Sequence, residues 1–410
     1  MKSFSSVAMQ PSHPDWEKAV SRENELYERT DDIRSPFLRD YTRVLHSLAY
    51  RRLKHKTQVF YGAAGSDHIC TRIEHVSHVE SVSNSIARTL GLNEELTRAI
   101  AMAHDLGHAP FGHRGESILS KLSMEYLGKP FWHEANGVYF ADNIELLDDP
   151  QNKKRNLDLT YAVRDGIISH CGEVDQNKIR PRDISIPLTE IKPGGALQAA
   201  TWEGCVVKFA DKIAYLGRDI EDAKRLKYFS DAQLSTLREL AGKCNRDAVN
   251  TTVITHSMII DICEHSSIEE GLTLSPLMEE VLAEIKLFNY ENIYKNKRLR
   301  YFDAYAELVI NSLFRELSSY YEGPDTFRKL EEDDFHRRKF IEEFARYLAD
   351  YCDLPENAPE WAKEDAEHLL NKKVYGSLET KELYLQAVVD YIAGMTDNYA
   401  VDAFGQLLMC

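Results

Sequence analysis

The sequence predicts an all-α protein, and three observations favour this class. Apolar residues recur at the three- and four-residue spacing of amphipathic helices, whereas the alternation typical of strands is scarce. Residues that start and stop helices bound many of these segments. At 410 residues the chain is also long enough to bury a sizeable core, as one large domain or two.

Nine segments carry the helical pattern. Asn93 is placed to cap the helix that contains Leu96 and Ile100, and the two glutamates after Asn93 suit the positive end of the helix dipole. Gly91 and Gly128 are placed to end two other helices. In chain order the expected helices are 74–90, 95–104, 115–127, 134–147, 203–225, 232–244, 252–265, 276–287 and much of 301–321.

Two stretches, 148–157 and 176–195, are rich in turn-forming residues and are expected to be loops. From about Ser230 onward the chain is rich in charged amphipathic helices and poor in reactive clusters, which suits packing, assembly or the shaping of a pocket. No Pro/Gly linker marks this change. We therefore expect a helical core with an additional C-terminal helical region, divided as an N-terminal extension 1–29, a core 30–235 and a region 236–410.

The composition excludes several classes of protein. A formal net charge of -16 argues against nucleic acid as the main partner, because phosphate contacts favour a basic surface. The seven cysteines are scattered and form no C-x-x-C pair, which indicates a reduced, cytoplasmic protein. The first residues lack the pattern of a secretion signal, and no apolar run is long enough for a membrane span, so a membrane is not expected.

The stretch 104–116, HDLGHAPFGHRGE, brings metal-ligand residue types and small residues together at the end of an expected helix. The apolar residues one and two turns earlier place His104 on the face that this helix turns inward. Gly107 is expected to let the chain leave the helix, so His104 and Asp105 face the loop that follows. A metal site needs such residues together, whereas a packing segment does not.

Histidines are concentrated around this stretch. Seven of the fifteen fall within the 66 positions from 68 to 133, where an even spread would place roughly two or three. A single histidine on an apolar face is more often a hydrogen-bonded core residue than a ligand, so the inference depends on the combination. The seven are His68, His75, His78, His104, His108, His113 and His133.

Two further residues are placed to complete a metal site. His75 opens an expected helix, and Asp211 is flanked by apolar residues on another. An unpaired carboxylate is costly to bury, so a bound cation is one of the few good reasons for Asp211 there. Two imidazoles and two carboxylates suit a divalent metal such as Mn, Fe, Zn, Ni or Mg and leave positions open for water and substrate. The absence of Cys ligands disfavours a structural zinc site.

A plainer interpretation remains open at this point. Asp105 then caps backbone amides, His104 is a core histidine, and Asp211 pairs with Lys208 or Lys212.

The motifs resemble the HD-domain metal-dependent phosphohydrolases, and within them the deoxynucleoside triphosphate triphosphohydrolases, also called dGTPase-like proteins. The general HD signature, a His, then His-Asp, then a distant Asp, fits the four metal-ligand candidates His75, His104, Asp105 and Asp211. Narrower matches cover roughly residues 30 to 225. They are 34–47, 50–60, 71–75, the HDLGHAPFGHRGE stretch, 132–134 and 211–219.

The resemblance implies that water attacks the α-phosphorus of a dNTP and releases the deoxynucleoside and inorganic triphosphate. It implies an HD-domain helical core with one divalent metal ion per active site, drawn from Mn, Mg, Fe, Ni, Co and Zn. It also implies that His113, Glu116 and His133 transfer protons and orient water, with His133 as a general acid tuned by Glu116. In the plainer interpretation, Glu116 only starts a helix and His133 lies on the surface beside Trp132.

The resemblance further implies a set of substrate contacts. Phosphate oxygens are assigned to Arg72, His108 and Lys212. Gln58 and Asp219 are assigned to the sugar 3′-hydroxyl, and Tyr215 would crowd a ribose 2′-hydroxyl. Asp211, Tyr215 and Asp219 are spaced i, i+4 and i+8, so they share one helix face. Without the resemblance, Lys212 and Asp219 would be interpreted as solvated charges.

Two other clusters are left with open interpretations. Arg43, Arg51, Arg52 and Lys56 are suited to phosphate at the active site, to a second nucleotide site, or to pairing with carboxylates. The polar run 168–173 has no assignment.

Two alternatives to a dNTP triphosphohydrolase stay open. One is another HD phosphohydrolase, acting on nucleoside monophosphates, cyclic nucleotides or guanosine polyphosphates, and the other is a noncatalytic nucleotide-binding assembly protein. The resemblance also implies a homo-oligomer, often a hexamer, and a regulatory dNTP as a second ligand.

Overall fold

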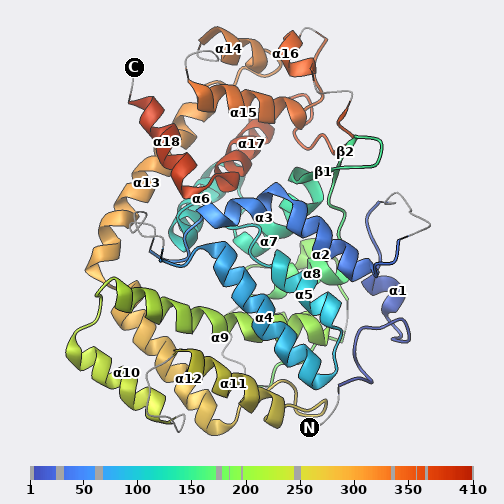
Figure 1. The fold of residues 1–410 in the computed structure, drawn as a ribbon. Helices are drawn as coiled ribbons and strands as arrows, with labels where there is room; N and C mark the ends of the chain where they lie inside the picture. The colour runs from blue at the N-terminus through green and yellow to red at the C-terminus, as the bar shows by residue number, and fades with distance from the viewer. Residues whose placement is uncertain are drawn as a thin grey trace.

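A computed structural model describes residues 4–24, 32–60, 68–171, 178–183, 185–194, 197–243, 251–333, 338–356, 358–364 and 368–408. Over these ranges the chain is built of helices, with one two-stranded sheet at the side of the molecule (Figure 1). The predicted all-α class is confirmed. Among the helices in these ranges, none is long and apolar enough to cross a bilayer.

The first half of the chain contains most of the elements that surround the predicted site. They are α1 (Trp16–Ala19), α2 (Pro36–His46), α3 (Leu48–Arg52), η1 (Leu53–His55), α4 (Arg72–Leu90), α5 (Glu94–Ala103), α6 (Gly112–Leu127), α7 (His133–Tyr139), η3 (Phe140–Ile144), β1 (Leu146–Asp148), β2 (Lys154–Asn156), α8 (Tyr161–Ser169), η4 (Leu188–Glu190) and α9 (Trp202–Arg225).

In the described parts of the second half, the named elements are all helical and are joined by turns and loops. Its elements are α10 (Asp231–Lys243), α11 (Thr251–His265), α12 (Pro276–Asn289), η5 (Tyr290–Tyr294), α13 (Lys297–Ser318), α14 (Thr326–Asp333), α15 (Lys339–Asp350), α16 (Glu360–Lys363), α17 (Lys381–Gly394) and α18 (Asp397–Leu407). The segments η3 and η5 are π-helical, whereas η1 and η4 are 3-10 turns.

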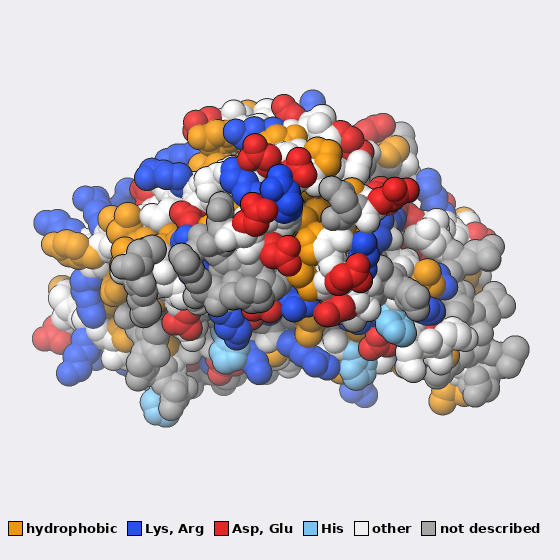
Figure 2. Space-filling view, turned by 90° about the horizontal axis from the view of Figure 1, so that it is seen from above, with side chains coloured by type: hydrophobic (Ala, Val, Ile, Leu, Met, Phe, Trp, Pro, Cys, Tyr) orange, Lys and Arg blue, Asp and Glu red, His pale blue; other side chains and the backbone are white. Residues whose placement is uncertain are grey.

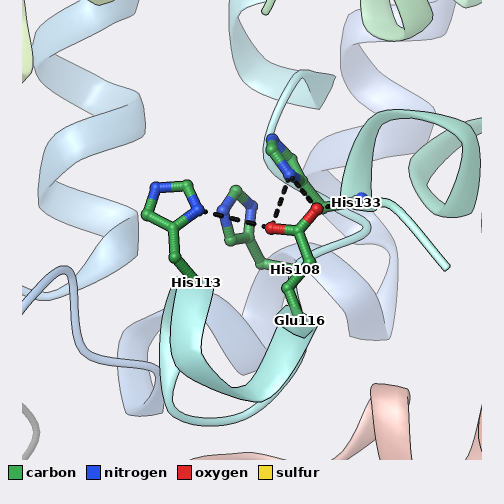
Figure 3. Close-up of side chains that lie close together, drawn as sticks. All are labelled: His108, His113, Glu116 and His133. Carbon is green, nitrogen blue, oxygen red and sulfur yellow. Dashed lines mark hydrogen bonds and ion pairs between the residues drawn. The ribbon is translucent and has the colours of Figure 1, made fainter. Parts of the chain in front are cut away.

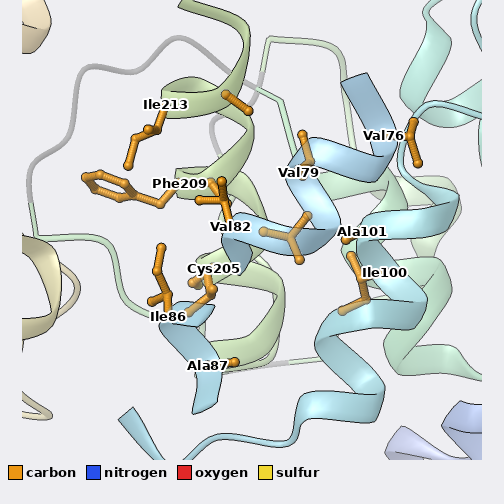
Figure 4. Close-up of a cluster of buried hydrophobic side chains, with 14 of the residues drawn as sticks. Val76, Val79, Val82, Ile86, Ala87, Ile100, Ala101, Cys205, Phe209 and Ile213 are labelled. Atoms are coloured by element: carbon orange, nitrogen blue, oxygen red, sulfur yellow. The ribbon is translucent and has the colours of Figure 1, made fainter. Parts of the chain in front are cut away.

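The first hydrophobic core lies where α4 packs against α5 and α9 (Figure 4). Val79 and Ile86 of α4 recur on one face of that helix and lie in the same core as Phe209 of α9. Each such buried side chain contributes roughly 1.5–3 kcal/mol. The helix ends agree with the sequence signals. Asn93 accepts the Leu96 amide at 3.0 Å as an N-cap, and Gly91 ends α4 in the left-handed region.

The second hydrophobic core joins α6 to α13, α15, α17 and α18. Ile118 and Leu119 of α6 lie in this core together with Ile310 of α13 and Val388 of α17. In Figure 1, α13 runs along one side of the molecule from the lower group of helices to the upper one. The helix that begins within the HDLGHAPFGHRGE stretch is therefore anchored in a core built mainly from the C-terminal half.

The end of the molecule formed by α14 to α16 carries charged side chains of both signs (Figure 2). Arg328 pairs with Glu332, and Arg346 with Glu342, each at the i, i+4 spacing of a helix surface. This distribution matches the charged amphipathic pattern expected for that part of the sequence.

Two predicted elements differ from the structure. The helix expected over 134–147 ends at Ile144 through the π-helical turn η3, and the chain continues into β1. The loop expected over 148–157 is in part strand, because β2 pairs antiparallel with β1. Asp149 closes the turn between them by accepting the amides of Gln151 and Lys153 at 2.9 Å each. The other expected helices are confirmed, with ends that differ by a few residues.

Candidate metal and catalytic centre

The four predicted metal ligands come together from three helices. His75 lies in α4, His104 and Asp105 directly follow α5, and Asp211 lies in α9. His75 Nε2 is 3.0 Å from Asp211 Oδ1 and 3.9 Å from Asp105 Oδ2. His104 Nε2 is 3.6 Å from Asp105 Oδ1 and 4.0 Å from Asp211 Oδ1. The packing of α4 against α5 and α9 is thus what assembles this cluster.

The donor atoms of the cluster fit a divalent cation. His104 Nδ1 lies 2.7 Å from the Ala101 carbonyl, which can only accept, so Nδ1 carries the proton and Nε2 presents its lone pair. That Nε2 is buried with no hydrogen-bond partner. Arg72 donates to Asp105 Oδ2 at 2.8 Å and orients the carboxylate. Two imidazoles and two carboxylates at these separations suit Mn, Fe, Mg or Zn.

The carboxylates of this cluster are held in their charged form. Burial opposes a charge on Asp211, but the neighbouring His75 lowers the pKa of that carboxyl to about 2. Burial also opposes a charge on Asp105, but the Arg72 guanidinium, 2.8 Å away, holds the pKa of that carboxyl well below the usual range. Both groups are therefore available as anionic ligands at neutral pH.

A second cluster joins the three predicted catalytic residues to His108 (Figure 3). Glu116 lies between two imidazoles, with an oxygen 3.0 Å from His133 Nδ1 and another 3.3 Å from His113 Nδ1. The backbone amide of His133 also donates to Glu116 at 3.0 Å. The ring of His108 lies against that of His133, with centroids 3.8 Å apart and the ring planes tilted by 39°. His133 is buried, whereas the His113 side chain is 72% exposed.

The two buried histidines of this cluster, His108 and His133, differ in charge at neutral pH. Burial alone would lower the pKa of His133, but the carboxylates of Glu116 and Glu134 raise it to about 9. Burial and the nearby Arg72 hold the pKa of His108 well below its usual range. At neutral pH His133 is therefore a charged proton donor, and His108 is a neutral imidazole.

Gly107 joins the two clusters by close packing. A Cβ at this position would lie 2.0 Å from the His133 carbonyl oxygen and 2.2 Å from the Gly137 amide. Asn136 fixes the same contact by donating to the Gly107 carbonyl at 2.8 Å. Gly107 lies outside the left-handed region, so the expectation that it frees the chain from the helix was wrong. Its role is to let α7 approach the HDLGH turn.

The predicted substrate contacts lie around these clusters at different depths. Arg72 is buried, and its Nε and Nη2 have no hydrogen-bond partner. Gln58 Oε1 is likewise buried and unpartnered. Asp219 is buried on α9 and accepts from Tyr294 at 2.5 Å, and burial raises its pKa to about 7. His108 is buried in the second cluster, and Lys212 and Tyr215 are half-buried on α9.

The residues of the basic cluster around α2 and α3 make different contacts. Arg43 donates to the carbonyls of Leu157 and Asn156, at 2.6 and 3.0 Å. Arg52 pairs with Glu145 at 2.5 Å. Arg51 instead lines a cavity of about 540 Å³. The other basic residues at that cavity are Arg34, Arg43, His46 and Lys154. The pairing interpretation therefore fits Arg52, and Arg51 stays suited to an anionic ligand.

Four residues of the site were not identified from the sequence. His170 belongs to the unassigned run 168–173, and its ring lies 4.9 Å from that of His104 and 5.4 Å from that of His133. Lys208 is buried on α9, and its Nζ has no hydrogen-bond partner. Tyr294 and Asp397 reach the site from the second half of the chain. Only His170 carried a local signal; the other three depend on contacts between distant segments.

Comparisons with known proteins identify the family of the chain. The family model of the HD domain matches residues 72–216, and that of the phosphohydrolase-associated domain matches residues 329–406. A protein of Desulfatibacillum aliphaticivorans is 37% identical over 72% of this chain and 76% of its own length. Proteins of Caldanaerobacter subterraneus and Bartonella tribocorum are 32% and 30% identical, over 95% and 98% of this chain and 91% and 96% of theirs.

All three relatives bear the name deoxyguanosinetriphosphate triphosphohydrolase-like protein. The HD match begins at Arg72 and ends one residue after Tyr215, so it spans all four metal-ligand candidates and the second cluster. The chain therefore belongs to the deoxyguanosinetriphosphate triphosphohydrolase-like proteins of the HD phosphohydrolase family.

Proposed function

We propose that this protein hydrolyses deoxynucleoside triphosphates to the deoxynucleoside and inorganic triphosphate, by attack of water at the α-phosphorus. The observation that carries the proposal is the contact between the two clusters. His104 and Asp105 offer metal ligands, and three residues later the ring of His108 lies against the charged imidazole of His133, with centroids 3.8 Å apart. A metal-binding group and a proton donor thus lie side by side, as phosphoryl transfer requires.

His75, His104, Asp105 and Asp211 would hold one divalent ion, which supplies Lewis-acid polarisation of phosphate and a water of lowered pKa. The protein's own groups supply the rest. Arg72, with two unpartnered nitrogens, and Lys212 are suited to phosphate oxygens. Lys208 lies one turn before Lys212, and burial with the charge of Lys212 lowers its pKa to about 8, so it stays mostly cationic at neutral pH.

The proton for the departing 5′-oxygen is assigned to His133. Glu116 contacts His133 Nδ1 and keeps the imidazole charged at neutral pH, which suits a general acid. His113 shares Glu116 from the exposed side and is suited to orienting water. The neutral ring of His108 can contact a phosphate oxygen without competing for the proton.

Recognition of the deoxyribose is assigned to Gln58, Asp219 and Tyr215. The unpartnered Oε1 of Gln58 and the raised pKa of Asp219 both suit a hydroxyl group as ligand. The cavity beside Arg51, with a volume of about 540 Å³ and a basic lining, is suited to the regulatory dNTP. We therefore include a second nucleotide in the test.

The decisive experiment incubates the protein with the four dNTPs, singly and mixed, in Mn²⁺, Mg²⁺, Fe²⁺ or Co²⁺, and identifies the products by ion-exchange chromatography. We expect equal amounts of deoxynucleoside and triphosphate. Release of pyrophosphate or monophosphate would overturn the proposal. Nucleoside monophosphates, cyclic nucleotides and guanosine polyphosphates are tested in parallel, and turnover of these alone would favour another HD phosphohydrolase.

A further inference from the structure

A third group of potential ligands adjoins the second cluster, which consists of His108, His113, Glu116 and His133. Cys171 Sγ lies 3.5 Å from His133 Nε2, and one ligand atom from each of His133, His170 and Cys171 lies within 4.8 Å of the others. His133 starts α7, whereas His170 and Cys171 directly follow α8. These two helices pack against each other, which brings the three side chains together where α7 begins and α8 ends.

We propose that His133, His170 and the thiol of Cys171 form a second metal site, which binds a thiophilic ion such as Zn²⁺ and thereby inhibits the enzyme. The site itself depends only on the geometry of these residues. The inhibitory consequence rests on the proposed function, because it assumes that His133 donates a proton during dNTP hydrolysis.

The spacing of two of the donors matches zinc without rearrangement. Zinc bonds of about 2.0 Å to nitrogen and 2.3 Å to sulfur, in tetrahedral geometry, separate the two ligand atoms by about 3.5 Å. That is the distance between His133 Nε2 and Cys171 Sγ. The ring nitrogen of His170 then has to approach by at most about 1.5 Å, and a water completes the four ligands.

Both imidazoles are oriented as metal-binding histidines usually are. His133 Nδ1 is held by the Glu116 carboxylate at 3.0 Å, which leaves Nε2 directed at the thiol. His170 Nδ1 lies 2.6 Å from the Ile167 carbonyl, so it carries the proton and Nε2 presents a lone pair. A carboxylate or carbonyl behind each imidazole is the arrangement that fixes the tautomer of metal ligands.

The donor set separates this site from the first cluster. A sulfur ligand favours Zn²⁺ over Mg²⁺ or Mn²⁺, whereas the first cluster offers only nitrogen and oxygen. Binding releases the thiol proton and the Nε2 proton of a charged His133 to solvent. The Glu134 carboxylate, 3.3 Å from His133 Nδ1, adds negative charge that favours a cation, although burial and this carboxylate raise the pKa of the Cys171 thiol. The charge of Lys208 has two opposing effects on metal binding: it favours the thiolate form of Cys171, and it repels a dication.

Occupation of the site removes the proposed general acid. A metal bound to His133 Nε2 uses the lone pair that the proton needs, so His133 can no longer protonate the leaving group. Cys171 is half-buried, whereas His133 and His170 are buried, so the thiol is the ligand through which an ion would enter. The enzyme would then be active with Mn²⁺ and inhibited by Zn²⁺ added to the Mn²⁺-loaded protein.

The first experiment measures binding without reference to activity. Metal-free protein is titrated with Co²⁺, and the absorption band of thiolate-to-cobalt charge transfer is followed together with the number of ions bound. We expect two ions per chain and a charge-transfer band in the wild type. Cys171→Ser should lose the band and one ion, whereas Cys352→Ala, which changes a cysteine buried in the second core, should keep both. An unchanged band in Cys171→Ser would overturn the site.

The second experiment measures the consequence. Zn²⁺ is added to Mn²⁺-loaded wild type, Cys171→Ala and Cys352→Ala during turnover of a dNTP. We expect Cys171→Ala to require at least about tenfold more Zn²⁺ for half inhibition, because it lacks one ligand. Equal inhibition of all three proteins would assign the effect to exchange in the first cluster and overturn the inhibitory role. If no dNTP is hydrolysed, the proposed function fails while the cobalt spectra still decide whether the second site exists.

Discussion

Asp397, the first residue of α18, accepts a hydrogen bond from the backbone amide of Phe111 at 2.9 Å, although 286 positions separate the two residues. Phe111 precedes α6 in the left-handed region, with a φ of 62°, which is strained for a side chain of this kind. The other oxygen of Asp397 accepts the amide and hydroxyl of Thr57, at 3.0 and 2.7 Å. One carboxylate therefore holds both the segment next to Gln58 and the turn that leads to His113.

Asp397→Asn should lower kcat without removing the metal. The amide can accept on only one side, so either Phe111 or Thr57 loses its partner, at about 1–3 kcal/mol of unfolding free energy. A displacement of the turn by about 1 Å can cost 10²-fold in rate. Metal content, kcat, KM and Tm should be measured together. The control is Asp402→Asn, which changes an exposed residue of the same helix and should behave as the wild type.

Lys56 makes a related connection. Its buried ammonium donates to the carbonyls of His108 and Ala393, and burial lowers its pKa to about 7. The sequence identified Lys56 as part of a basic cluster suited to phosphate or to carboxylates. The structure instead pairs it with two backbone carbonyls from segments far apart in the chain. No local pattern contains that information, because it depends on how α17 packs against the HDLGH turn.

Glu116→Gln should shift the basic limb of the pH profile to lower pH. In the wild type the pKa of His133 is about 9, above the ordinary 6.5, so the charged acid persists until the pH approaches 9. Without the Glu116 charge, burial dominates and the pKa falls back toward 6.5 or below. The profile of kcat against pH measures this shift. A basic limb that stays near pH 9 in the variant would show that His133 is not the proton donor.

The Glu116–His133 pair also predicts that the free energy of unfolding depends on pH. A histidine whose pKa is raised on folding contributes stability that is fully present below about pH 6.5 and is lost as the pH rises through about 9. Thermal unfolding of the wild type should therefore show Tm falling between these values. Glu116→Gln should lose most of this component of the slope, and Glu125→Gln, an exposed change on the same helix, should retain it.

His104→Ala combined with Asp105→Ala should abolish metal binding and hydrolysis while far-ultraviolet circular dichroism stays near normal. Two of the four ligands are lost, but both lie just beyond the end of α5 and not within its hydrogen-bonded turns. Removal of Asp105 leaves Arg72 buried with a single charge and no counterion, so Tm should also fall. His265→Ala, at an exposed position, is the control. Metal retained by the double variant would contradict this ligand set.

The helices and their ends could be predicted, because the signals that determine them are local in the sequence. Caps such as Asn93, the apolar periodicity of α4 and α5, and the adjacent His104 and Asp105 are all encoded within a few residues of one another. The hairpin of β1 and β2 was missed because each strand has only three residues and carries no alternation. The oligomeric state, the regulatory dNTP, the division into 1–29, 30–235 and 236–410, and the cytoplasmic location stay predictions.

The candidate site was predictable only where it lies in motifs. His75, His104, Asp105 and Asp211 were predicted from their residue types and their places on the expected helices, and the HD signature fits the same four. The structure brings them within 4.0 Å of their nearest partners. Tyr294, which donates to Asp219, and Asp397 lie in segments without such a motif. Their positions follow from the packing of α12, η5 and α18 on the first half of the chain.

Gly107→Ala should be among the most damaging single changes outside the ligands. The new methyl group would lie 2.0 Å from the His133 carbonyl and 2.2 Å from the Gly137 amide, and both are backbone atoms at the start of α7. Because backbone cannot yield locally, α7 has to shift, which costs about 1–3 kcal/mol or more and moves His133 away from Glu116. We expect lower Tm, lower kcat and a basic limb below pH 9. Gly242→Ala, in α10 with nothing within 4 Å of the new methyl, should leave kcat unchanged and raise stability by up to about 1 kcal/mol. A Gly107→Ala protein with normal kcat and Tm would contradict the proposed contact between the HDLGH turn and α7.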